Sequence, residues 1–162
     1  MLVKAAALLV LLLLLWMVFR FAMGLRWAKV SREAARAAEQ ARGRRVVAEI
    51  PVSEDEVVFF LEDDAGFYWG GRQARKREIR GARLLLNGGV MASFARNGEA
   101  LPHPSTPEEY QGRERWEVVV YLEDGGEERI ACGGLREGVS RDMATRVFEA
   151  IRSAVAPGKE QA

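Results

Sequence analysis

The segment VVFFLEDDAGFYWGG, from residue 57 to residue 71, decides how most of the chain is read. Its first five residues are β-branched, aromatic or leucine side chains, and side chains of this kind are enriched in strands. The acidic sequence that follows ends in Gly66 and has the composition of a turn. The aromatic run from Phe67 to Gly71 then predicts a second strand that pairs back on the first. The segment therefore predicts a β-hairpin and, with it, an antiparallel domain.

The same alternation of strand and turn composition continues on both sides of this hairpin. Asn87-Gly88 is the strongest short-range hairpin signal, and a second clear turn lies at Glu123-Asp124-Gly125-Gly126-Glu127. These turns separate segments rich in valine, leucine and aromatic residues. With the two strands at 57–61 and 67–71, the expected strands number seven, and the other five are 46–52, 78–86, 90–96, 116–122 and 128–132.

The period of the apolar residues changes after the last expected strand. Ser140 has the side chain of a helix N-cap, and Pro157-Gly158 is a stop signal. Between them the spacing i, i+3, i+4, i+7, i+11 predicts one amphipathic helix that buries its apolar stripe. We expect this helix to cover the open end of a strongly bent sheet or partial barrel. The stripe consists of Ala144, Val147, Phe148, Ile151 and Val155.

Seven antiparallel strands followed by one amphipathic helix resemble the bacterial pleckstrin-homology-like (PH-like) domains that are often found beside a membrane anchor. The segments that carry the resemblance are VVFFLEDDAGFYWGG, EIRGARLLLNGGVMASFA, WEVVVYLEDGGEERIACG and RDMATRVFEAIRSAV. The resemblance implies a binding or scaffolding domain without catalysis, and it supplies no signature residues. In eukaryotic members a basic loop near the first hairpin binds phosphoinositides, whereas the turn Ser53-Glu54-Asp55 is acidic here.

The N-terminal stretch AAALLVLLLLLWMVFRFAMGLRW, residues 5–27, predicts a transmembrane anchor. As one helix, residues 5–25 span about 30 Å at about 1.5 Å per residue, which is enough to cross a bilayer. A cleaved signal peptide is the competing interpretation, but no A-x-A-like cleavage site follows the run. Basic residues crowd its C-terminal side and, by the positive-inside rule, predict an outside N-terminus and a cytoplasmic domain at the inner membrane. The juxtamembrane basic residues include Arg20, Arg26, Lys29, Arg44 and Arg45.

These patterns divide the chain into a transmembrane anchor (1–27), a polar juxtamembrane helix or stalk (28–45), a PH-like β domain with its C-terminal helix (46–156) and a tail (157–162). The formal net charge is +1, so composition gives no sign of nucleic-acid binding. A single cysteine excludes an internal disulfide. The sequence does not set the oligomeric state.

A basic stretch, RQARKREIRGAR, is the main candidate contact surface. It follows two aromatic residues beside Gly70-Gly71 and could bind an anionic lipid headgroup or a protein partner, with a solvated connector as the alternative. The candidate contact residues are Tyr68, Trp69, Arg72, Arg75, Lys76, Arg77, Arg80 and Arg83.

No catalytic, cofactor-binding or metal-binding residues are predicted. His103 lies between two prolines without a ligand set around it, and Cys132 on the last expected strand has no base beside it in the sequence. Neither a phosphate-binding loop nor a dinucleotide fingerprint occurs. The expected function is a single-pass, membrane-anchored, non-enzymatic binding or scaffold module that engages a protein partner or the membrane surface. The alternative is a pilin-like or secretion-system assembly subunit with its β domain outside the cytoplasm.

Overall fold

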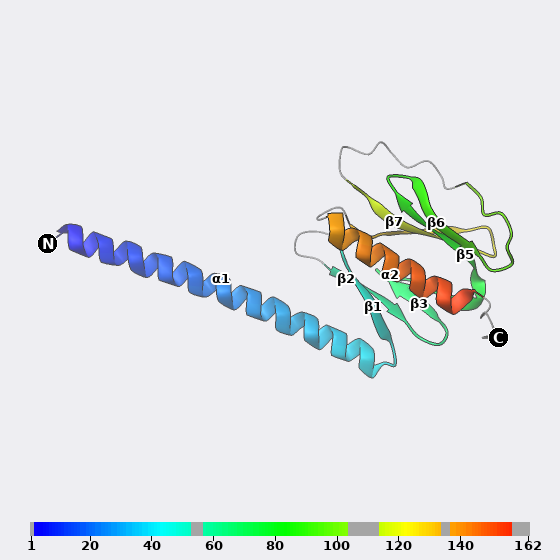
Figure 1. Cartoon of the computed structure of the whole chain (residues 1–162). Coiled ribbons are helices and arrows are strands. Elements are labelled where there is room, and N and C mark those ends of the chain that lie inside the picture. Colours follow the sequence, from blue (N-terminus) through cyan, green and yellow to red (C-terminus); the bar gives the residue numbers. More distant parts are fainter. Residues whose placement is uncertain (1, 53–56, 104–113, 134–136, 157–162) are drawn as a thin grey trace, which may run out of the picture. The chain divides into compact units, whose positions relative to one another are not determined.

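The computed structural model describes residues 2–52, 57–103, 114–133 and 137–156. The chain divides into two compact units, residues 1–42 and 43–162. The helix α1 (Leu2–Ala41) makes up the first unit, and the second unit contains all the strands and the helix α2 (Glu137–Val155) (Figure 1). Gly43, with φ of 79°, follows α1 in the left-handed region, where glycine alone carries no steric penalty.

The predicted transmembrane anchor is wrong. Among the helices that the structure describes, none is both long enough and apolar enough to cross a membrane. The predicted single-pass localisation at the inner membrane, with an outside N-terminus and a cytoplasmic domain, depended on that span and is corrected with it.

The strands form two four-stranded antiparallel sheets. The first sheet has the order β1-β2-β3-β4 and consists of β1 (Arg45–Pro51), β2 (Val57–Glu62), β3 (Gly66–Trp69) and β4 (Arg72–Arg75). A short 3₁₀ helix, η1 (Lys76–Glu78), leads to the second sheet. That sheet has the order β6-β5-β7-β8 and consists of β5 (Ile79–Leu86), β6 (Gly89–Ala95), β7 (Trp116–Leu122) and β8 (Glu127–Ala131).

Two sheets replace the predicted seven-stranded bent sheet or partial barrel. The additional strand is β4, which pairs with β3 through a turn at Gly70 and Gly71, both with positive φ. In the second sheet, β7 pairs with β5 and not with β6, the strand that precedes it in the chain. The mainly antiparallel arrangement is seen, but its division into two sheets is not what the sequence predicted.

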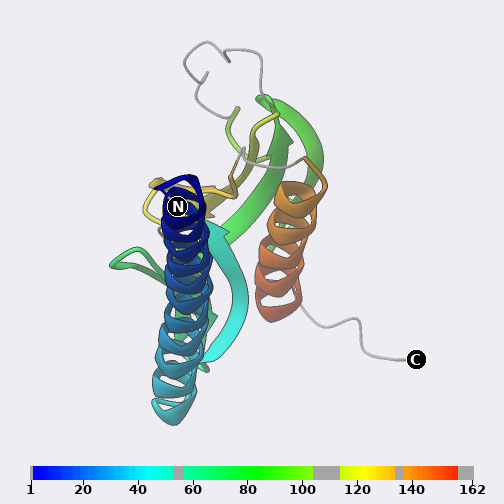
Figure 2. The same ribbon diagram turned by 90° about the vertical axis from the view of Figure 1, so that its left-hand side faces the viewer.

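The helix α2 lies along the strands of the second unit and contacts β5, β1 and β7 (Figure 2). The predicted apolar stripe is confirmed, because all five of its side chains are buried in the core between α2 and the sheets. The predicted N-cap is wrong. The helix begins at Glu137, and Ser140 is a buried residue within it. The predicted stop at Pro157-Gly158 lies outside the described residues.

The second sheet has buried side chains on both of its faces. Toward α2, Val118 and Val120 of β7 join the main core. On the opposite face, Val119 and Tyr121 pack with Leu101, which comes from the segment after β6. Because both faces are covered, the six residues from Trp116 to Tyr121 are all buried.

Candidate functional site

The first sheet carries a hollow of about 230 Å³ on the second unit. Its walls combine aromatic rings, a leucine and two arginines. We call this hollow the Tyr68 pocket, and we define it by Arg44, Phe59, Leu61, Tyr68, Trp69 and Arg72.

Strand register brings the walls of the Tyr68 pocket together. Leu61 of β2 is directly opposite Tyr68 of β3, and Tyr68 is directly opposite Gln73 of β4. Directly opposed residues in antiparallel strands point to the same face of a sheet, so these three side chains form one row across three strands. Phe59 lies two residues before Leu61 and is therefore on the same face. Arg72 is directly opposite Trp69, so its side chain starts from the other face of the sheet, and the two residues line the pocket at its end beside the glycine turn.

Arg44 and Tyr68 form the most tightly organised part of the pocket. The Arg44 guanidinium carbon lies 4.3 Å from the centre of the Tyr68 ring, in cation–π geometry. The same guanidinium lies 4.0 Å from the carboxylate of Asp63, to which the Tyr68 hydroxyl donates a hydrogen bond. That hydrogen bond is the main reason that the pKa of Tyr68 is raised.

The carboxylate of Asp63 holds this arrangement from the turn between β2 and β3. It accepts hydrogen bonds from the backbone amides of Ala65 and Gly66, both at 2.9 Å. Burial by itself would raise the pKa of Asp63, but the amide and Tyr68 hydrogen bonds outweigh it and lower that pKa. Asp63 is therefore ionised at neutral pH and fixes the Tyr68 ring beneath Arg44.

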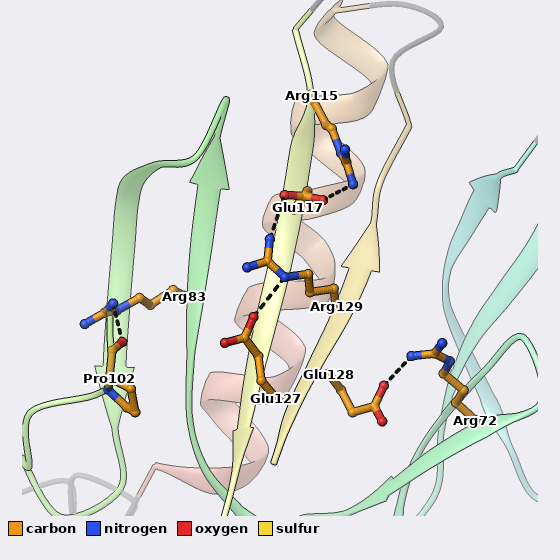
Figure 3. Close-up of polar contacts among 8 residues, drawn as sticks. All are labelled: Arg72, Arg83, Pro102, Arg115, Glu117, Glu127, Glu128 and Arg129. Carbon is orange, nitrogen blue, oxygen red and sulfur yellow. Dashed lines mark hydrogen bonds and ion pairs between the residues drawn. The ribbon is translucent and has the colours of Figure 1, made fainter. Parts of the chain in front are cut away.

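Arg72 closes the other end of the pocket through a contact between the two sheets. Its guanidinium lies 2.5 Å from the carboxylate of Glu128 on β8 (Figure 3). The Arg72 side chain is 60% exposed and that of Glu128 is 31% exposed. An ion pair this exposed contributes about 0–1 kcal/mol to stability, so Arg72 can exchange Glu128 for another carboxylate at little cost.

The other basic residues of the 72–83 stretch do not join this pocket. Each of them lies near an acidic side chain or a backbone carbonyl. Arg75 and Arg77 lie near Glu78, Lys76 lies 3.0 Å from Glu62, Arg80 lies 2.7 Å from Glu99, and Arg83 donates to the carbonyls of Leu101 and Pro102. The stretch is thus distributed over β4, η1 and β5, and Arg72 is its one basic residue among those that line the pocket.

The basic residues predicted beside the N-terminal helix also separate. Arg20 lies over the ring of Trp16, and Lys29 forms an ion pair with Glu33. Arg45 pairs with Glu62, while Arg44 lines the Tyr68 pocket. The side chain of Arg26 is outside the described part of α1. Sequence patterns therefore singled out four residues that line the pocket, but they did not group them together. They placed Arg44 among the juxtamembrane basic residues, and Tyr68, Trp69 and Arg72 among the candidate contact residues.

A buried carboxylate on the second sheet was not among the residues that the sequence singled out. Glu117 of β7 is fully buried, and its oxygens lie 2.6 Å from Arg115 and 3.5 Å from Arg129 (Figure 3). Arg129 also lies 2.8 Å from Glu127. Glu117 is the one charged residue within WEVVVYL, and this is the signal that could have drawn attention to it. The cluster joins β7 to β8, and we assign it a structural role.

The two residues considered for catalysis, Cys132 and His103, differ in burial. Cys132 has no exposed surface, and burial raises the pKa of its thiol to about 12, so the nucleophilic thiolate is suppressed at neutral pH. His103 is exposed. Among the described residues, no three histidine, cysteine or acidic side chains form a group that could hold a metal ion.

Comparison with known proteins gives no match to a protein-family model, a curated protein or a solved structure. The PH-like resemblance therefore stays a prediction, and the candidate function rests on the geometry of the Tyr68 pocket.

Proposed function

We propose that this chain is a non-enzymatic binding module that engages a protein partner through the Tyr68 pocket. The observation that carries the proposal is the placement of two arginines, Arg44 and Arg72, around a floor of aromatic and aliphatic side chains. Such a surface suits an acidic side chain that is followed or preceded by an apolar one in the partner. The arginines would bind the carboxylate, and Phe59, Leu61 and Tyr68 would cover the apolar group.

The size of the pocket supports a side chain as its occupant. Pockets for drug-sized ligands and cofactors have volumes of about 300–1,000 Å³. The Tyr68 pocket, at about 230 Å³, is smaller than that range and matches one or two side chains of a partner protein.

The contacts of Arg44 and Arg72 are consistent with both arginines binding a carboxylate of a partner protein. The exposed Arg72–Glu128 pair contributes little to stability, so a carboxylate of a partner can replace Glu128. Arg44 is held in position by the Tyr68 ring and by Asp63, so less side-chain entropy is lost when it binds. Arg72 can thus exchange Glu128 for a carboxylate of the partner, and Arg44 is already ordered before the partner binds.

Peptide selection tests the proposal and does not require the identity of the partner. A display library of random twelve-residue peptides is selected on the full chain, with counter-selection on the Arg72→Glu variant. The counter-selection removes peptides that bind elsewhere, including those that bind the apolar side chains of α1. Affinities of the selected peptides are then measured by fluorescence anisotropy, with Arg77→Glu as the control because Arg77 is also exposed and lies outside the pocket.

We expect the selected peptides to carry an aspartate or glutamate next to a leucine or an aromatic residue. Their binding to Arg72→Glu should be at least about tenfold weaker, which corresponds to the loss of one charge-assisted contact. Binding to Arg77→Glu should be unchanged. A selection that yields no such peptides, or peptides that bind both variants equally well, would show that the pocket is not the binding site.

A further inference from the structure

The strand β6 forms one end of the second sheet, because the order of that sheet is β6-β5-β7-β8. Two of its apolar side chains are exposed, Val90 at 50% and Met91 at 58%. An unpaired strand edge that also exposes apolar side chains is a template for pairing with another strand.

The composition of β6 sets it apart from the other three edge strands. Its seven residues, GVMASFA, include no charged residue and no proline. In contrast, β1 contains Arg45, Glu49 and Pro51, β4 contains two arginines, and β8 contains two glutamates and an arginine. Charged residues and proline at an edge are the usual means of preventing edge-to-edge pairing. A β-bulge also hinders pairing at an edge. The strand β6 has one, at Met91, because Leu84 pairs with Ala92 and Leu85 pairs with Val90.

The hydrogen-bond pattern shows which groups of β6 face away from β5. The amide of Arg96 donates to the carbonyl of Arg80 at 2.8 Å, directly after the end of β6. Because hydrogen-bonded and non-hydrogen-bonded pairs alternate in an antiparallel ladder, Phe94 and Ala92 also bond toward β5. Ser93, opposite Arg83, then directs its N–H and C=O away from β5, toward a side where no described strand pairs with β6. Ala95 does the same, and its carbonyl accepts a bond from Gly98 at 3.3 Å.

We propose that β6 pairs in antiparallel fashion with β6 of a second copy of this chain, about a two-fold axis at Ser93. In this register the two Ser93 residues exchange N–H···O=C bonds across the axis. Met91 of one copy lies opposite Ala95 of the other, and Ala92 lies opposite Phe94. The exposed side chain of Met91 thereby becomes covered next to Ala95, which already packs against the Leu101 cluster.

Self-complementarity is the argument for a second copy as the partner. Between Met91 and Ala95 the two-fold pairing places no charged residue opposite another. The same operation on β4 would place Arg72 opposite Arg75, and on β8 it would place Arg129 opposite itself. Like charges directly opposite each other destabilise a strand pair, so β6 is the edge that suits a two-fold contact.

A cysteine at the proposed axis tests the pairing directly in the full chain. Residues in a hydrogen-bonded antiparallel pair have Cα atoms about 5.5 Å apart, which is within the range that a disulfide can bridge. Ser93→Cys should therefore form a disulfide-linked dimer under mild oxidation. The controls are Val52→Cys and Val139→Cys, whose positions are 61% and 54% exposed. The native Cys132 is buried, so it does not compete.

We expect Ser93→Cys to cross-link at least about tenfold faster than either control, because the pairing holds the two thiols close together. A tenfold ratio corresponds to about 1.4 kcal/mol, the free energy of one weak contact. Association through the apolar side chains of α1 would not favour position 93 over positions 52 and 139. Equal rates for the three variants would overturn the proposal.

Two further variants test whether the edge contributes to association. Ser93→Pro removes an amide that faces away from β5, so it leaves the ladder between β5 and β6 intact. Met91→Lys adds a charge to the edge, and Val139→Lys adds the same charge to an equally exposed position on α2. Sedimentation velocity should show at least about tenfold weaker dimerisation for the two β6 variants and no weakening for the control. If Ser93→Pro does not fold, the comparison of Met91→Lys with Val139→Lys decides the test. If these two variants dimerise equally strongly, the proposed pairing is refuted.

Discussion

The buried carboxylate of Glu117 lies 2.6 Å from the exposed guanidinium of Arg115. The Arg115 side chain is 46% exposed, whereas that of Glu117 is 1% exposed. Arg129, 3.5 Å away and 25% exposed, approaches Glu117 as well. A carboxylate that has lost its water is thus compensated by two cations that keep part of theirs. This arrangement avoids the full desolvation cost of a buried ion pair.

The cluster around Glu117 predicts a large difference between two alanine substitutions. Glu117→Ala removes the buried partner of two arginines and should lower the free energy of unfolding by about 2–4 kcal/mol. Glu127→Ala, which removes an acidic neighbour of the same Arg129 at the surface, should cost at most about 1 kcal/mol. Urea unfolding followed by circular dichroism measures both. Equal losses for the two variants would contradict a special role for the buried carboxylate.

Burial of Cys132 predicts that stability falls in alkaline solution. Its pKa is raised from 9.0 in the unfolded chain to about 12 in the fold, so folding favours the protonated thiol. This contribution is complete below pH 9 and is lost as the pH rises from 9 toward 12, by at most about 1.4 kcal/mol per pH unit. Between pH 9 and 10.5 the stability of the wild type should fall more steeply than that of Cys132→Ala. Parallel curves for the two proteins would show that the thiol is not held protonated.

The close approach of β5 and β6 at Gly81 predicts a second destabilising change. A Cβ atom at this position would lie 2.4 Å from the carbonyl oxygen of Phe94 and 3.0 Å from the Cα of Ala95. Because these are backbone atoms, Gly81→Ala should displace β6 and cost about 1–3 kcal/mol. Gly98→Ala meets no atom within 4 Å, so it serves as a control that carries only the cost of a positive φ, about 1 kcal/mol. Thermal unfolding of both variants should show the larger decrease in Tm for Gly81→Ala.

The hydrogen bond from Tyr68 to Asp63 predicts a measurable change in one carboxyl group. Tyr68→Phe removes a donor that lowers the pKa of Asp63, so that pKa should rise. The stability contributed by ionised Asp63 is present above its unfolded pKa and is lost as the pH falls toward its folded pKa, so in the variant this contribution should be smaller and its loss should be complete at a higher pH. Carboxyl resonances followed by NMR titration measure the shift. Tyr121→Phe, on the other sheet, should leave the Asp63 titration unchanged.

Local sequence patterns predicted the strands that alternate apolar and polar residues or stand beside a clear turn. The segment from Trp116 to Leu122 is a strand with the predicted bounds, and the apolar stripe of α2 is buried as predicted. The strand β4 was missed because only Ala74 among its four residues is buried, so its sequence lacks alternation. Its position is set by pairing with β3, which is a tertiary effect.

Contacts between distant segments explain the other differences. Leu101 covers the outer face of β7, and nothing in the proline-containing sequence around Leu101 indicates that it packs there. Burial of Glu117 on that same face of β7 was therefore not predictable from WEVVVYL alone. In the pocket, Arg44 meets Tyr68 because β1, β2 and β3 are neighbours, whereas its position in the sequence groups Arg44 with the residues of the N-terminal helix. The transmembrane prediction is overturned by the finding that none of the described helices is both long enough and apolar enough to cross a membrane.

The pairing of β7 with β5 also determines the order in which the second unit can fold. The hairpins β5–β6 and β7–β8 join residues close in the chain and can form on their own within microseconds. When the two hairpins dock, β5 pairs with β7, with Leu86 opposite Trp116 and Ile79 opposite Leu122. The chain between these two strands must therefore form a closed loop before any of these contacts is made. Loop closure of this kind costs entropy before it gains contacts, and it slows folding. Docking of the two hairpins is thus the step at which we expect the rate-limiting barrier, and lengthening the segment between β6 and β7 would slow folding while leaving unfolding almost unchanged.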